Sequence, residues 1–91
     1  MMHFLIVYDS RAAKLVRYEE YVDSEYPRAA AERLKAEIAY LGQAHMEVVV
    51  LSAASKQVIE LTHGRYFKSP EDLAREGIDL LDGAAGRDRA P

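Results

Sequence analysis

Two short stretches of the chain are apolar at every position: residues 4–8 (Phe-Leu-Ile-Val-Tyr) and residues 48–51 (Val-Val-Val-Leu). In a strand with one wet face, apolar and polar side chains alternate, because successive residues point to opposite sides of the sheet. Neither stretch alternates in this way. They therefore predict two strands, at about residues 3–9 and 46–51, that are covered on both faces of a sheet.

A more mixed pattern follows the first of these strands. Residues 15–22 interleave charged and apolar side chains, which is typical of an edge strand. The turn-forming residues in between, 9–13, allow only a short connection. The first two strands are therefore expected to form a hairpin.

Helical signals occupy the remaining segments. Asp23 and Pro27 mark a helix start near residues 24–26, and Gly42 marks its end. Apolar residues at spacings of three and four predict the stripe of this helix that faces the sheet: Tyr26, Ala30, Leu34, Ile38 and Leu41. A second helix is expected after Ser52 or Ser55, and a third after Ser69.

These elements predict an α+β fold with β-β-α-β-α topology plus a C-terminal helix. The most apolar strand should lie in the centre, which gives a three-stranded antiparallel sheet of order 2-1-3. The first two helices would then share one face. The other face would need the third helix or another subunit. A single domain is expected over residues 1–82, followed by a flexible tail at 83–91.

The composition narrows the class of protein. The 91 residues are 49% apolar, which suits one globular domain. The absence of cysteine excludes disulfides and thiolate metal sites. A net charge of −3 argues against a general nucleic-acid binder. The apolar runs are too short to span a membrane and no basic leader is present, so a cytoplasmic location is expected.

Two groups of polar residues are candidates for ligand binding. In the segment 62–67, His63 and Arg65 could donate hydrogen bonds to an anion beside Tyr66. The alternative is that the aromatic residues pack on the sheet and leave both cations in water. Asp9, near Arg11 at the end of the first strand, could act as a base if burial raised its pKa. Its alternative role is to form the turn.

The sequence gives little support for a metal site, a phosphate-binding loop or a catalytic serine. The histidines His3, His45 and His63 lie in three different elements, and none has the spacing of a metal pair. The glycines are scattered, without a phosphate-binding loop. Ser52 and Ser55 show no histidine and aspartate arrangement that the sequence reveals, and helix capping explains them. We therefore expect neither a metal nor a cofactor.

Three segments carry a resemblance to other proteins: residues 4–9 (Phe-Leu-Ile-Val-Tyr-Asp), 47–51 (Glu-Val-Val-Val-Leu) and 62–67 (Thr-His-Gly-Arg-Tyr-Phe). In this order and spacing, over residues 3–67, the chain resembles a group of short uncharacterised bacterial proteins. The Thr-His-x-Arg-Tyr-Phe segment is the most specific part. The resemblance implies a bacterial, cytoplasmic origin and no mechanism.

We therefore expect a small non-enzymatic interaction or regulatory module that acts as a homodimer, with protein partners and no membrane contact. One alternative is an anion-binding or small-molecule-binding enzyme subunit that uses His63 and Arg65. Another is a nucleic-acid-associated regulator with a basic face made of four residues: Lys14, Arg17, Arg28 and Arg33.

Overall fold

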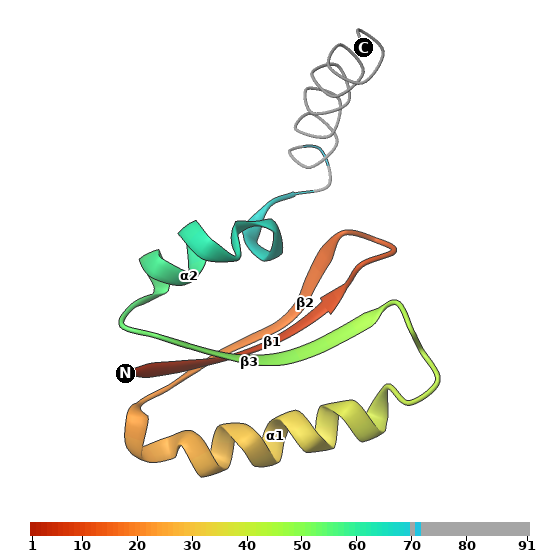
Figure 1. Ribbon diagram of the computed structural model, residues 1–91. Helices are drawn as coiled ribbons and strands as arrows, with labels where there is room; N and C mark the ends of the chain where they lie inside the picture. Colours follow the sequence, from red (N-terminus) through yellow and green to blue (C-terminus); the bar gives the residue numbers. More distant parts are fainter. Residues whose placement is uncertain (70, 72–91) are drawn as a thin grey trace, which may run out of the picture.

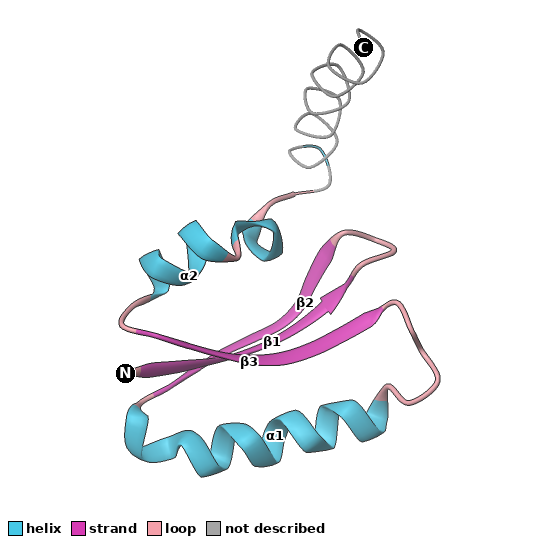
Figure 2. Cartoon of the chain, viewed as in Figure 1, coloured by secondary structure: helices cyan, strands magenta, loops and turns pink. Residues whose placement is uncertain are grey.

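A computed structural model describes residues 1–69 and residue 71 (Figures 1 and 2). Its sheet contains β1 (Met2–Asp9), β2 (Lys14–Tyr21) and β3 (Met46–Ala53). β1 pairs antiparallel with both neighbours, so the strand order is β2-β1-β3. This confirms the predicted α+β class and the sheet order 2-1-3. The predicted third helix and the tail at 83–91 lie outside the described residues, apart from positions 69 and 71.

The helical elements begin where the sequence places them. A short 3-10 turn, η1 (Asp23–Glu25), leads into α1 (Tyr26–Ala39), which has its proline in the first turn. After β3 come α2 (Lys56–Thr62) and a second 3-10 turn, η2 (Gly64–Phe67). The hydroxyl of Ser55 accepts a hydrogen bond from the backbone N–H of Val58 and so caps α2.

The helices lie on opposite faces of the sheet. Figure 1 shows α1 along one face and α2 with η2 across the other. On β1, Phe4 and Ile6 face α2, whereas Leu5 faces α1. The expectation that the first two helices share a face is therefore wrong. Ile59 of α2 is buried on the face of the sheet that carries Phe4 and Ile6, opposite α1.

The face toward α2 holds an aromatic core. Tyr8 meets Tyr66 edge to face with ring centroids 5.1 Å apart, and Tyr18 meets Phe67 at 5.5 Å. Ile59 fills the space between these pairs and β1. Large side chains from sheet and helix therefore close this face within one copy of the chain.

The contact of α1 with the sheet differs from the prediction. Its buried residues are the small Ala29 and Ala36, whereas Leu34 and Ile38 are each 59% exposed and Leu41 is 76% exposed. At 3.6 residues per turn, positions 34 and 38 fall on the far side of the helix from 29 and 36. The predicted stripe is thus largely turned to solvent.

Two polar contacts accompany this rotation of α1. Arg17 on β2 donates a hydrogen bond of 2.9 Å to Glu32, which lies on the same side of the helix as the two buried alanines. At the start of the helix, Asp23 is bonded to His3 on β1 at 2.8 Å. With the alanine side against the sheet, the larger apolar residues point the opposite way.

Candidate functional site

Asp9 forms the β1–β2 turn. One oxygen of its carboxylate accepts hydrogen bonds from the backbone N–H groups of Ala12, at 2.9 Å, and Arg11, at 3.0 Å. The bond from Ala12 is the main reason that the pKa of Asp9 is lowered. A lowered pKa makes a weaker base, so this geometry does not supply the raised pKa that a general base would need. The side chain of Arg11 is exposed.

Arg65 and Tyr66 come together around Glu47 of β3. The guanidinium donates to the Glu47 carboxylate at 2.6 Å and the Tyr66 hydroxyl donates to the same oxygen at 3.1 Å. Arg65 also lies over the rings of Tyr8 and Tyr66. The Glu47 contact raises the pKa of Arg65, while burial raises that of Tyr66. The positive charge of Arg65 is therefore already balanced by a carboxylate.

His63 lies at the outer side of this cluster. Its ring is exposed, bonded to the Thr62 hydroxyl at 2.8 Å and stacked on Tyr66 at 6.5 Å between centroids. His63 and Arg65 thus both lie against the ring of Tyr66. Asp9 is not part of this cluster, because its carboxylate accepts hydrogen bonds from its own turn. Within residues 1–69 and 71, no three potential metal-ligand side chains gather.

The arginines of the suggested basic face pair with acids. Arg17 bonds Glu19 as well as a glutamate of α1, and Arg28 and Arg33 each form an ion pair along the helix. Such pairing reduces the positive potential that would attract phosphate groups.

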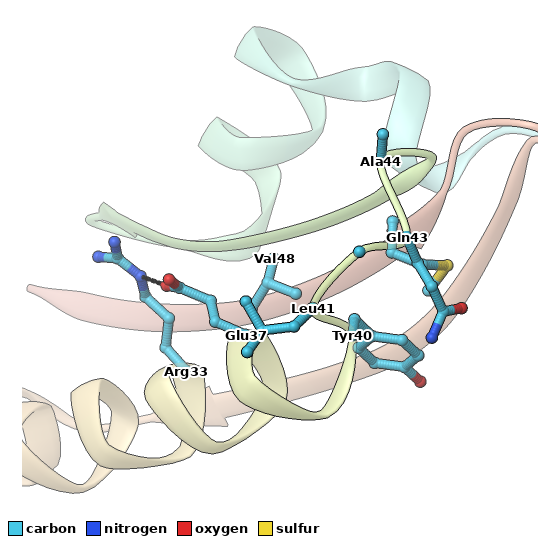
Figure 3. A pocket seen from close by; sticks show the side chains of 9 residues that line it. Arg33, Glu37, Tyr40, Leu41, Gln43, Ala44 and Val48 are labelled. Carbon is cyan, nitrogen blue, oxygen red and sulfur yellow. Dashed lines mark hydrogen bonds and ion pairs between the residues drawn. The ribbon is translucent and has the colours of Figure 1, made fainter.

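Exposed apolar residues gather where α1 passes β3. An open hollow of about 510 Å³ separates the end of the helix from the strand, and its lining includes Arg33, Glu37, Leu41 and Val48 (Figure 3). This side of α1 therefore looks toward β3. We call the exposed residues Leu34, Ile38 and Leu41, on α1 and just after its end, the α1 stripe; Leu41 lines this hollow, and the other two face outward.

The two edges of the sheet have opposite characters. The β2 edge carries Arg17, Glu19 and Glu20, and a register shift between β1 and β2 marks a bulge near Val16. Charges and bulges both discourage a further strand from pairing. On β3, residues 48–51 are all apolar and half-buried, and in the described part of the chain this strand pairs only with β1.

One polar arrangement was not predicted from the sequence. His3 of β1, Ser52 of β3 and Asp23 of η1 form a continuous chain of hydrogen bonds. A histidine at the end of an apolar strand signals that a polar partner is needed. The identity of that partner depends on the register, which pairs position 3 with position 52.

Comparison of the chain with protein-family models, curated proteins and solved structures gave no match. In the part of the chain that the structure covers, no helix is both long enough and apolar enough to cross a bilayer. Function must therefore be inferred from the geometry of the chain itself.

Proposed function

We propose that the protein is a small interaction module that forms a two-fold homodimer through the β3 edge and the α1 stripe. The observation that carries this proposal is the position of the exposed stripe beside an apolar strand edge that has no neighbour among the described residues. A second copy offers the same two features in the complementary orientation.

The strand edge suits pairing with itself. A two-fold axis perpendicular to the sheet places β3 antiparallel to its copy and extends the sheet from three strands to six. The backbone groups along the open edge then gain partners. Residues 48–51 are apolar on both sides of the strand, so cross-strand contacts form on both faces of the extended sheet.

The helices fit the same arrangement. α1 packs against both β1 and β3, so its axis lies about half a strand spacing inside β3. Neighbouring strands are about 4.8 Å apart, which places the two α1 axes about 10 Å apart across the two-fold axis. Packed helices have axes about 8–10 Å apart. The two α1 helices would therefore lie side by side when the strands pair, and Leu34 and Leu41, which lean toward the β3 side of the helix, would approach the same residues of the copy.

The energetics require both parts of the interface. The three stripe residues of each copy are more than half exposed. Burying their exposed surface is worth about 1–2 kcal/mol per residue, or about 6–12 kcal/mol for the six residues of two copies. Association costs about 4–15 kcal/mol in lost freedom. The stripe alone is close to balance, so strand pairing along β3 is needed for a stable dimer.

Light scattering after size exclusion tests the proposal. The full chain at about 10 µM, a concentration at which micromolar dimers form, should have twice its chain mass of 10.2 kDa. The double variant Leu34→Glu/Ile38→Glu should be a folded monomer, because two carboxylates in the helix contact would lose their hydration. Leu61→Glu is the matched control: Leu61 is 86% exposed on α2, away from the interface, and the variant should remain a dimer.

Two outcomes would refute the dimer. One is a monomeric wild-type chain at this concentration. The other is a dimer whose mass is unchanged in Leu34→Glu/Ile38→Glu, since that would place the contact elsewhere. Far-ultraviolet circular dichroism of each variant establishes that the fold is retained.

A further inference from the structure

His3 connects two polar side chains from distant parts of the chain. Its Nδ1 lies 2.7 Å from the Ser52 hydroxyl oxygen, and its Nε2 lies 2.8 Å from a carboxylate oxygen of Asp23. The imidazole is held rigidly: His3 is only 6% exposed, and the ring of Tyr26 meets it edge to face at 4.7 Å.

The partners determine where the ring proton sits. An ionised carboxylate only accepts hydrogen bonds, so we assign the proton of neutral His3 to Nε2, which donates to Asp23. Nδ1 is then an acceptor, and Ser52 donates its hydroxyl proton to it. A general base that activates a serine needs this tautomer, with a bare ring nitrogen facing the hydroxyl.

The serine is accessible although the histidine is not. Ser52 is exposed near the end of β3, so a small molecule can reach its Oγ from solvent. We propose that Ser52 is an activated nucleophile, with His3 as its general base and Asp23 as a positioning residue, and that it takes acyl groups from small carboxylic esters. The inference rests on these hydrogen bonds and not on the proposed dimer.

The transfer balances with these groups alone. Oγ of Ser52 attacks the ester carbonyl carbon as its proton moves to Nδ1 of His3, and Asp23 holds the resulting imidazolium through Nε2. The carbon–oxygen bond to the alcohol then breaks, and the alcohol leaves with the proton from Nδ1. Water attacks the acyl-serine by the same proton route, which releases the carboxylic acid and restores the Ser52 hydroxyl.

The test uses the full chain and p-nitrophenyl acetate. Intact-mass spectrometry should show one added acetyl group early in the reaction, and peptide mapping should place it on Ser52. Ser52→Ala should lower the rate of p-nitrophenol release at least 10-fold, given the usual contribution of general-base catalysis. Ser24, the exposed serine that follows Asp23 in the sequence, provides the matched control: Ser24→Ala should leave the rate of p-nitrophenol release unchanged.

The positioning role of Asp23 has its own readout. Its side chain is 72% exposed, so Asp23→Asn should keep the fold while slowing acylation and moving the acid limb of the pH–rate profile. Asp23→Glu should restore part of the rate. Acetylation that spreads over lysines or the N-terminus without Ser52, or a rate unaffected by Ser52→Ala in the folded protein, would overturn the proposal.

Discussion

The two faces of the sheet are closed by different means. Toward α2, large side chains such as Ile59 and Tyr66 interlock with Phe4 and Tyr8 of the central strand. Toward α1, the helix touches the sheet through small alanines and is held by polar contacts at its start and middle. The face toward α2 is therefore covered by large side chains of the same chain. On the face toward α1, the large apolar residues of the helix point to solvent instead of the sheet.

This difference separates two uses of apolar residues. A residue that faces the sheet stabilises the fold, and its loss leaves a cavity. A residue on the outer side of α1 adds nothing to the isolated fold and is available for association. The same amino acid should therefore have very different effects in the two helices.

The largest expected difference is between two isoleucines. Ile59→Ala should lower the free energy of unfolding by about 2–5 kcal/mol, because Ile59 is 1% exposed and its removal leaves a cavity. Ile38→Ala should change it by less than about 0.5 kcal/mol, since that side chain faces solvent and alanine favours the helix. Chemical denaturation measures both, in a Leu34→Glu background that removes association from the comparison.

A cost above about 1 kcal/mol for Ile38→Ala in that background would show that the α1 stripe packs within one chain. The contrast between the two faces would then disappear. In the wild-type background, the same substitution should weaken the proposed dimer, so the midpoint should fall and should depend less on protein concentration.

A second prediction enlarges a residue instead of removing one. Ala36→Leu should cost about 1–3 kcal/mol, because the added atoms would push α1 away from the sheet. Ala39 provides the matched control: it is exposed near the end of the same helix, and Ala39→Leu should be nearly neutral. Equal urea-unfolding midpoints for Ala36→Leu and Ala39→Leu would contradict the packing of Ala36 against the sheet.

The smallest expected effect concerns the polar contact at the middle of α1. The Arg17 guanidinium lowers the pKa of both Glu19 and Glu32. Their stabilisation is present above the unfolded pKa near 4.5 and is lost as pH falls through the lower folded values. Arg17→Gln should lower Tm at pH 7 by no more than about 4 °C, since exposed ion pairs contribute little.

Thermal unfolding at several pH values checks this sign. The Tm difference between wild type and Arg17→Gln should shrink as the pH is lowered from 7 toward 3. A difference that stays constant would mean that Arg17 acts through the packing of its aliphatic part and not through its charge.

The strands and their order were predictable because the longest uninterrupted apolar run, residues 4–8, forms the central strand. The rotation of α1 was not, because Ala29 and Ala36 carry too little apolar surface to outweigh Leu34 and Ile38 in a helical pattern. The hydrogen-bonded site around Ser52 was not predictable either. Its three members lie at positions 3, 23 and 52. The register of β1 against β3 pairs His3 with Ser52, and the pairing of His3 with Tyr21 on β2 brings Asp23 close.

The charged, bulged β2 edge has a consequence for how far assembly can proceed. A protein with an apolar strand edge is at risk of forming filaments, since each added copy exposes a new edge for the next. In the proposed dimer, a two-fold axis at β3 would use up both apolar edges at once. Only the β2 edges would then remain at the two ends of the six-stranded sheet, and the charges and bulge of β2 discourage pairing with a further strand. Growth of the proposed assembly along the sheet would therefore stop at two copies.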